Sequence, residues 1–309
     1  MEIVPTPTSV RLPFDGAPLD ATPSLDHPTY PEERELDANP RYRILRDFES
    51  RYLPDARDIR IYLPEAYLSE PTRRFPVFYL HDGQNLFDGR LSYVAGKTWQ
   101  ANSTADRLTR EGRIEPVILV GLDNTGTHRM ADYTPTRDKE YGGGEGPLYG
   151  RLLVDELKPL IDSALRTLPD AANTGLGGSS LGGLISLFLG LQHPTVFGKL
   201  AVLSPSVWWD NRALLNSVGA PKRTILSRFQ SLPAPPPAAP RARIWLDMGM
   251  AEGLRHLRDC DLLAKRLVTR GWKPGQDLEY LRVPGGLHNE EAWAARFDQV
   301  LEFLFPGAL

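Results

Sequence analysis

The chain has little cysteine and no excess of positive charge. Cys260 is the single cysteine among 309 residues, so no disulfide can form within the chain. Lysine and arginine number 36 against 39 aspartate and glutamate residues, which gives a formal net charge of -3. Nucleic-acid binding needs a clustered excess of basic residues to neutralise phosphates. The arginine pairs at 73–74 and at 241 and 243 are short and isolated, so the sequence predicts no nucleic-acid partner.

Long apolar runs and metal-binding patterns are also missing. No segment approaches the roughly 20 apolar residues that a membrane-spanning helix requires. The opening residues MEIVPTPTSVRLPFDG lack the basic and then apolar regions of a signal peptide. The six histidines are scattered and form no H-E-x-x-H motif. We therefore expect a soluble, cytoplasmic protein with no membrane span and no metal site.

The first 40 residues differ in composition from the rest. They are rich in proline, threonine and aspartate and show weak periodicity, as in an extended arm or tail. We expect an N-terminal arm at 1–40 and one folded domain over 41–309. A second proline-rich stretch, Leu232–Pro240, is predicted to be a surface loop, because the strand pattern resumes directly after it.

Short β-rich runs alternate with helical patterns from residue 41 onward. Several runs, such as VFYL and VILVGL, are continuously apolar, as in strands covered on both faces. The predicted strands are Tyr42–Phe48, Asp58–Leu63, Pro76–Leu80, Pro116–Leu122, Thr174–Gly177, Lys199–Ser204, Arg243–Asp247 and Leu278–Val283. The predicted helices are Thr98–Glu111, Leu148–Thr167, Leu181–His193, Glu252–Thr269 and Asn289–Phe305. This order predicts an α/β fold with an eight-stranded, mostly parallel sheet that starts antiparallel and carries helices on both faces.

The strongest local motif is a G-x-S-x-G between a predicted strand and a predicted helix. It runs from Gly178 through Ser179, Ser180 and Leu181 to Gly182. In such a sharp turn, glycines two before and two after the serine let the strand and the helix approach closely. Only Ser180 has glycine at both positions, because Leu181 stands two after Ser179. We therefore predict Ser180 as a nucleophile and Ser179 as a structural hydroxyl.

A serine of this kind is followed along the chain by an acid and then a histidine. His288 lies in a glycine-rich loop between the last predicted strand and the last predicted helix, whereas His256 falls within a helical pattern. We predict His288 as the general base. Glu252, just beyond the seventh predicted strand, is the first candidate for the acid that orients it. Asp247, at the end of that strand, stays as the alternative, and Asp210 is a weaker third candidate.

Acyl transfer also requires N–H donors for the oxyanion that develops during attack. The backbone N–H of Leu181, directly after the predicted nucleophile, is one expected donor. The second is expected from the loop after the third predicted strand, which reads HDGQN. Gly83 in this loop permits a tight turn, and Gln84 is the predicted donor.

Residues next to these loops are candidates for a substrate pocket. His81 and Asp82 open the HDGQN loop and are expected to line it. Trp208 and Trp209 follow another strand at the same sheet edge, where they either wall the pocket or cap the core. The remaining tryptophans are expected to pack inside the domain: Trp99, Trp245, Trp272 and Trp293.

Several segments together resemble the Putative esterase family of α/β hydrolases, which includes enterochelin-esterase-like and esterase-D-like proteins. The matching segments are RRFPVFYLHDGQNLFD, TWQANSTADRL, VILVGLDN, RMADYTP, GLGGSSLGGLISL, LSPSVWW, WLDMGMAEG and GGLHNEEAW. The resemblance implies an α/β-hydrolase fold and cofactor-free hydrolysis of carboxylic esters, with Ser180, Glu252 and His288 as the triad. Met250 and Ala251 depart from the family pattern, since many relatives carry threonine and a basic or polar residue there.

The resemblance leaves the ester open. Family members act on siderophore trilactones, on acetylated or feruloylated sugars and on simple esters, so we expect a small-molecule or sugar-linked ester substrate. An acyltransferase on the same fold is the first alternative function, and a non-catalytic binding protein is the second. The oligomeric state follows from none of these patterns.

Overall fold

The computed structural model describes Leu36, residues 38–219 and residues 241–307. Nearly all of the predicted arm and the whole predicted loop Leu232–Pro240 lie outside these residues. Within them, no helix has the length and apolar character needed to cross a lipid bilayer.

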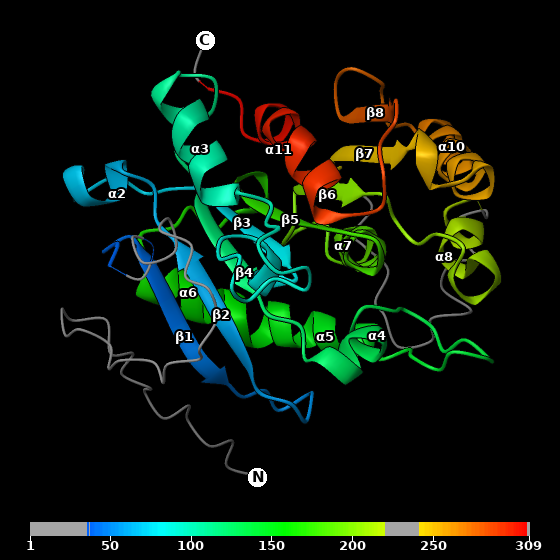
Figure 1. The fold of residues 1–309 in the computed structure, drawn as a ribbon, viewed down its shortest axis with the longest axis horizontal. Helices are drawn as coiled ribbons and strands as arrows, with labels where there is room; N and C mark the ends of the chain where they lie inside the picture. Colours follow the sequence, from blue (N-terminus) through cyan, green and yellow to red (C-terminus); the bar gives the residue numbers. More distant parts are fainter. Residues whose placement is uncertain (1–35, 37, 220–240, 308–309) are drawn as a thin grey trace, which may run out of the picture.

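An eight-stranded sheet runs through the centre of the domain (Figure 1). The strands are β1 (Tyr42–Phe48), β2 (Arg57–Tyr62), β3 (Val77–His81), β4 (Ile118–Leu122), β5 (Thr174–Ser179), β6 (Lys199–Leu203), β7 (Arg243–Gly249) and β8 (Leu278–Val283). Their spatial order is β1-β2-β4-β3-β5-β6-β7-β8. The pairs β1–β2 and β2–β4 are antiparallel and the remaining pairs are parallel. The predicted mostly parallel sheet with an antiparallel start is confirmed.

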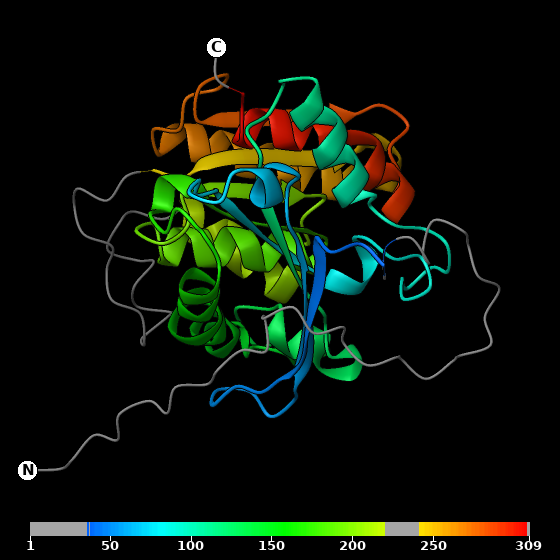
Figure 2. The ribbon, with the colours of Figure 1, turned by 90° about the vertical axis from the view of Figure 1, so that its left-hand side faces the viewer.

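Helices cover both faces of this sheet (Figures 1 and 2). They are α2 (Ala66–Ser69), α3 (Ala101–Arg110), α4 (Arg129–Asp132), α5 (Gly146–Arg151), α6 (Lys158–Ala164), α7 (Leu181–Gln192), α8 (Trp209–Gly219), α10 (Leu254–Thr269) and α11 (Glu290–Leu304). Short 3₁₀ turns are η1 (Gly83–Asn85), η2 (Gly126–His128), η4 (Ala171–Asn173) and η5 (Met250–Glu252), and η3 (Leu152–Leu157) is a π-helical turn. Each of the five helices predicted from the sequence overlaps at least one observed helix.

The two faces of the sheet have separate hydrophobic cores, because successive strand side chains point to opposite faces. Tyr79 of β3 packs in one core with Phe188 of α7. Its neighbour Phe78 packs in the other core with Phe297 of α11. Figure 1 shows α3 and α11 on one side of the sheet and α5, α6 and α7 on the other. The continuously apolar strands are thus explained by burial on both faces.

Two predicted helices differ from the observed ones for local physical reasons. The pattern over Leu148–Thr167 becomes α5, the π-helical turn η3 and α6. Pro159 has no N–H to bond the fourth carbonyl before it, which favours a wider turn there. The helix predicted from Glu252 begins instead at Leu254, because Gly253 has φ 109°. Glu252 therefore lies in a loop turn and not on a regular helix.

The parallel strands bring the predicted site residues to one edge of the sheet. Loops after their carboxyl ends carry Asp82 and Gln84 (after β3), Ser180 (after β5), Trp208 (after β6), Glu252 (after β7) and His288 (after β8). Binding sites of open α/β sheets lie at this carboxyl edge. The fold therefore gathers residues that are more than two hundred positions apart in the sequence.

Candidate active site

Ser180 occupies the tight turn between β5 and α7. Its backbone has φ 57° and ψ −119°, which is a strained conformation for a residue with a side chain. The Ser180 N–H donates to the Leu203 carbonyl at 3.0 Å, and the Ser180 carbonyl accepts from the Ser206 N–H at 3.0 Å. These bonds to the segment after β6 hold the strained turn in place at the N-terminus of α7.

The glycines of the G-x-S-x-G motif are required by close packing around this turn. A Cβ atom at Gly178 would lie 3.1 Å from the carbonyl carbon of Gly182 and 3.1 Å from the His81 side chain. Real Cβ atoms rarely approach so closely, so a larger residue would push the strand and the helix apart. Ser179, the other serine of the motif, is buried as the last residue of β5.

The Ser180 hydroxyl has a second hydroxyl beside it. Ser206 Oγ lies 3.2 Å from Ser180 Oγ, and the Ser206 side chain is buried. Ser206 is not among the site residues predicted from the sequence. The signal that could have found it is the LSPS segment, which follows β6 at the same sheet edge as the predicted nucleophile.

The structure brings the predicted acid and base into contact. Nδ1 of His288 lies 2.7 Å from Oε2 of Glu252. The Glu252 side chain is only 3% exposed, whereas the His288 side chain is 46% exposed. The imidazole also meets the Trp293 ring edge-on, with the ring centroids 5.0 Å apart. A buried carboxylate thus holds one nitrogen of a ring that remains open to solvent.

The other carboxylate oxygen of Glu252 accepts two hydrogen bonds. Oε1 accepts from the Ser204 hydroxyl at 2.6 Å and from the Gly249 N–H at 3.0 Å. Burial alone would raise the pKa of Glu252, but the hydrogen bonds from His288 and Ser204 outweigh it and lower the pKa below its ordinary value. Glu252 is therefore ionised at neutral pH.

This lowered pKa predicts a contribution of Glu252 to stability in mild acid. Because the folded pKa lies below the ordinary value of 4.5, the contribution is fully present above about pH 4.5 and is lost as the pH falls through the folded pKa. Glu252→Gln removes the titrating group, so we expect its free energy of unfolding to fall less steeply with acid than that of the wild type. Urea unfolding over a pH series from neutral to acid measures both slopes, and equal slopes would contradict the prediction.

Asp247, the alternative acid, lies deeper in the domain. It is fully buried at the carboxyl end of β7. Its carboxylate accepts from Arg296 Nη2 at 2.8 Å, from Trp245 Nε1 at 2.8 Å and from the Ser204 N–H at 3.1 Å. The geometry therefore favours Glu252 as the partner of His288, and Asp247 as the partner of a buried arginine.

The loop after β3 has the sharp turn that the sequence predicts. Asp82 is in the left-handed conformation, with φ 57° and ψ 51°, and η1 follows it. The Gln84 side-chain oxygen accepts from the Asn124 backbone N–H at 3.0 Å. Leu181, the other predicted donor, is the first residue of α7, and N–H groups in the first turn of a helix have no intrahelical partner.

Gly83 makes a testable contribution to this loop. A Cβ at this position would lie 2.8 Å from the carbonyl carbons of Gly121 and Leu122 in β4 and 2.6 Å from the Asp123 carboxylate. Backbone atoms in a central strand cannot yield easily, so we expect Gly83→Ala to lower the free energy of unfolding by about 1–3 kcal/mol. Urea unfolding measures this loss. An unchanged urea midpoint in Gly83→Ala would contradict the prediction that the packing leaves no room for a Cβ atom.

His81 and Asp82 are both buried. His81 is 1% exposed, and its Nδ1 lies 2.9 Å from the Tyr149 hydroxyl. Burial lowers the pKa of His81 to about 3, so its ring is neutral at neutral pH. Asp82 accepts from Arg129 at 2.6 and 2.8 Å and from the Asn124 side chain at 2.7 Å. Contact of either residue with a substrate stays a prediction.

The two adjacent tryptophans have different environments. Trp209 is buried in the core at the start of α8, and its Nε1 donates to the Thr136 carbonyl at 2.8 Å. Trp208 is only partly buried, and the exposed Tyr141 meets it edge-on at 6.2 Å between ring centroids. Trp209 thus caps the core, while Trp208 keeps a surface that a ligand can contact.

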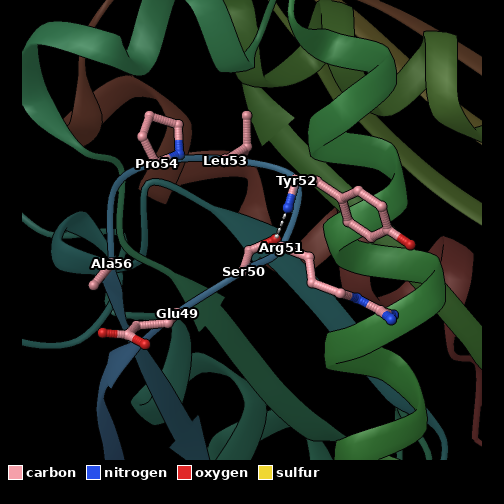
Figure 3. A pocket seen from close by; sticks show the side chains of 7 residues that line it. All are labelled: Glu49, Ser50, Arg51, Tyr52, Leu53, Pro54 and Ala56. Atoms are coloured by element: carbon pink, nitrogen blue, oxygen red, sulfur yellow. Dashed lines mark hydrogen bonds between the residues drawn. The ribbon is translucent and has the colours of Figure 1, made fainter. Parts of the chain in front are cut away.

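A hollow of about 400 Å³ lies elsewhere on the surface, in the loop between β1 and β2 (Figure 3). Its lining residues are Glu49, Ser50, Arg51, Tyr52, Leu53, Pro54 and Ala56. None of the predicted site residues lines it. We place the candidate site at the carboxyl edge of the sheet because the contacts of Ser180, Glu252 and His288 lie there.

Comparisons with known proteins agree with this fold and identify a family. The model of the family described as Putative esterase matches residues 50–304. The uncharacterized protein YbbA of Bacillus subtilis is 26% identical over 81% of this chain and 92% of its own length. The iron(III) salmochelin esterase of Escherichia coli is 29% identical over 70% of this chain, and the match spans only 47% of that longer protein.

Solved structures show the same fold at lower sequence identity. The BES protein of Bacillus cereus has a TM-score of 0.65 at 19% identity, over 93% of this chain and 99% of that one. The enterobactin esterase FES of Shigella flexneri has a TM-score of 0.61 at 21% identity, over 85% of this chain and 59% of that one. The family match covers most of the described domain, and the chain belongs to the Putative esterase family of carboxylic ester hydrolases.

Proposed function

We propose that this protein is a serine esterase in which Ser180 is the nucleophile, His288 the general base and Glu252 the acid that orients it. The observation that carries the proposal is the 2.7 Å contact between Glu252 and His288. It lies at the sheet edge where Ser180 stands on its strained turn. A carboxylate on Nδ1 fixes the tautomer in which Nε2 is free to accept a proton.

Acylation begins when the Ser180 hydroxyl attacks the ester carbonyl. His288 Nε2 takes the hydroxyl proton, and the new oxygen–carbon bond places negative charge on the former carbonyl oxygen. The Leu181 backbone N–H and Gln84 are proposed to donate to this oxyanion. His288 then returns the proton to the departing alkoxide, so an alcohol leaves and an acyl ester of Ser180 remains.

Deacylation repeats these steps with water as the nucleophile. His288 Nε2 takes a proton from the water as its oxygen attacks the acyl carbon. The collapse of the second tetrahedral intermediate breaks the bond to Ser180, and His288 returns the proton to the serine oxygen. The products are a carboxylic acid and the free enzyme, and no cofactor is consumed.

The substrate is proposed to be a small-molecule or sugar-linked ester. The names of two relatives support this range. One is the salmochelin esterase described above. The other is an endo-1,4-beta-xylanase/feruloyl esterase of Xylanibacter ruminicola, which is 32% identical over 47% of this chain. Trp208, two residues beyond Ser206, has a partly exposed ring that can contact an apolar or aromatic group.

Hydrolysis of a panel of esters tests this proposal. The panel contains p-nitrophenyl acetate and butyrate, a feruloyl ester and a catecholate ester, and released acid and alcohol are quantified. We expect turnover of at least one ester with acid and alcohol formed in equal amounts. Folded protein that hydrolyses none of these esters would contradict it.

A further inference from the structure

Ser204 lies between the predicted triad acid and a buried cluster of donors. It directly follows β6, has φ 39° and is 2% exposed. Its hydroxyl oxygen lies 2.6 Å from Glu252 Oε1, 2.8 Å from Arg296 Nη2 and 3.2 Å from Trp293 Nε1. Ser204 is not among the site residues predicted from the sequence, and Trp293 is predicted there only to pack inside the domain.

The chemistry of these neighbours fixes the direction of the hydroxyl proton. A serine hydroxyl has one proton to donate and two lone pairs that accept. Arginine and the tryptophan indole can only donate, so Arg296 and Trp293 occupy both lone pairs of Ser204. The single proton of Ser204 must therefore point to Glu252.

A buried ion pair keeps this arrangement rigid. Arg296 and Asp247 lie 2.8 Å apart, and their side chains are 2% and 0% exposed. The second arm of Arg296 is anchored as well, since its Nη1 donates to the Ala292 carbonyl at 2.6 Å. Moving the guanidinium away from Ser204 would leave the buried Asp247 charge without its partner, which is costly.

The arrangement also restricts where Glu252 can carry a proton. Its Oε1 accepts two hydrogen bonds, from Ser204 and from the Gly249 N–H. A proton on Glu252 could then lie only on Oε2, which faces His288 Nδ1. When Glu252 is ionised, Nδ1 must be the donor, so the basic lone pair of His288 lies on Nε2.

We propose that Ser204 is a positioning residue that keeps Glu252 ionised and orients it toward His288, with Arg296 and Trp293 directing its hydroxyl proton. The inference rests on the proposed roles of Glu252 and His288. Ser204 acts through Glu252 and does not itself touch the substrate. Asp247 is the counterion that holds Arg296 in place.

Replacing Ser204 with alanine tests this role. We expect Ser204→Ala to lower kcat for p-nitrophenyl acetate about tenfold, because a hydrogen bond to a charged group is lost, while KM stays near the wild-type value. We also expect the acidic limb of the pH–rate profile to move to higher pH, since Glu252 loses a hydrogen bond that favours its ionised form. A merely structural serine would not shift that limb.

The matched control is Thr174→Val, which removes a buried hydroxyl at the opposite end of β5. The Thr174 hydroxyl donates to the Asp170 carbonyl at 2.9 Å, and its removal should leave kcat and the pH profile unchanged. If Ser204→Ala does not fold, Ser204→Cys, whose thiol is a weak donor, should show the same shift to a smaller extent. A wild-type acidic limb in whichever folded variant is measured would overturn the proposal.

Ser180→Ala distinguishes failure of this inference from failure of the proposed function. If Ser180→Ala is inactive while Ser204→Ala keeps wild-type kcat and pH dependence, the triad stands and the role of Ser204 is wrong. If Ser180→Ala keeps full activity, the proposed function itself is wrong.

Discussion

Ser180→Ala is expected to lower kcat for p-nitrophenyl acetate by about 10⁴-fold or more, because the acyl-enzyme can no longer form. Alanine removes only the hydroxyl, and the strained turn keeps its backbone bonds to Leu203 and Ser206. Protein stability should therefore change little. Initial rates measure the loss. They are normalised to the concentration of folded protein, which circular dichroism reports.

Ser179→Ala is the matched control, because it makes the same change at the neighbouring residue. Ser179 ends β5 and is buried, and we assign it no part in the chemistry. Its alanine variant should keep kcat within a few-fold of the wild type. Activity that survives in Ser180→Ala but disappears in Ser179→Ala would place the nucleophile one residue earlier.

Glu252→Gln is expected to lower kcat by about 10³- to 10⁴-fold without unfolding the protein. The donors around the side chain decide how the new amide lies. The Ser204 hydroxyl and the Gly249 N–H both point at the Oε1 position, so the amide oxygen must take that place. The amide nitrogen then faces His288 Nδ1, which has to accept, and the ring proton moves to Nε2. The base is thereby locked in the wrong tautomer.

Glu290→Gln is the control for this variant, because it neutralises another buried carboxylate, two residues after His288 in the sequence. Glu290 begins α11 and accepts from the Asn85 side chain at 3.4 Å. Its glutamine variant should retain kcat within a few-fold of the wild type. Equal rates for Glu252→Gln and Glu290→Gln would remove the basis for Glu252 as the acid.

The fold was largely readable from the sequence, because its signals are local. Continuous apolar runs and their alternation with helical patterns predict all eight strands, with ends that differ by at most two residues from the observed ones. The exceptions depend on single backbone positions. Gly253 delays the start of α10, and Pro159 accompanies the π-helical turn before α6. Helix α8, which begins at Trp209, is not among the predicted helices.

The site was readable only in part. Ser180 and His288 are predicted as site candidates at this sheet edge, because the glycine spacing around Ser180 and the order of the triad residues along the chain can be read directly from the sequence. The sequence leaves Asp247 as the alternative to Glu252, because Asp247 ends the seventh predicted strand and Glu252 lies just beyond it. The sequence does not reveal Ser204 and Arg296, because their hydrogen bond joins the residue after β6 to α11 across 92 residues. Donor and acceptor assignments of that kind exist only in three dimensions.

Covalent labelling of Ser180 tests the central claim most directly. A fluorophosphonate probe reacts with a serine only when a neighbouring base activates it, and peptide mass spectrometry identifies the residue that gains the probe. We predict that the label appears on Ser180 in the wild type and that His288→Ala slows this labelling severely. A label on a different residue, or equal labelling rates in the two proteins, would contradict the account.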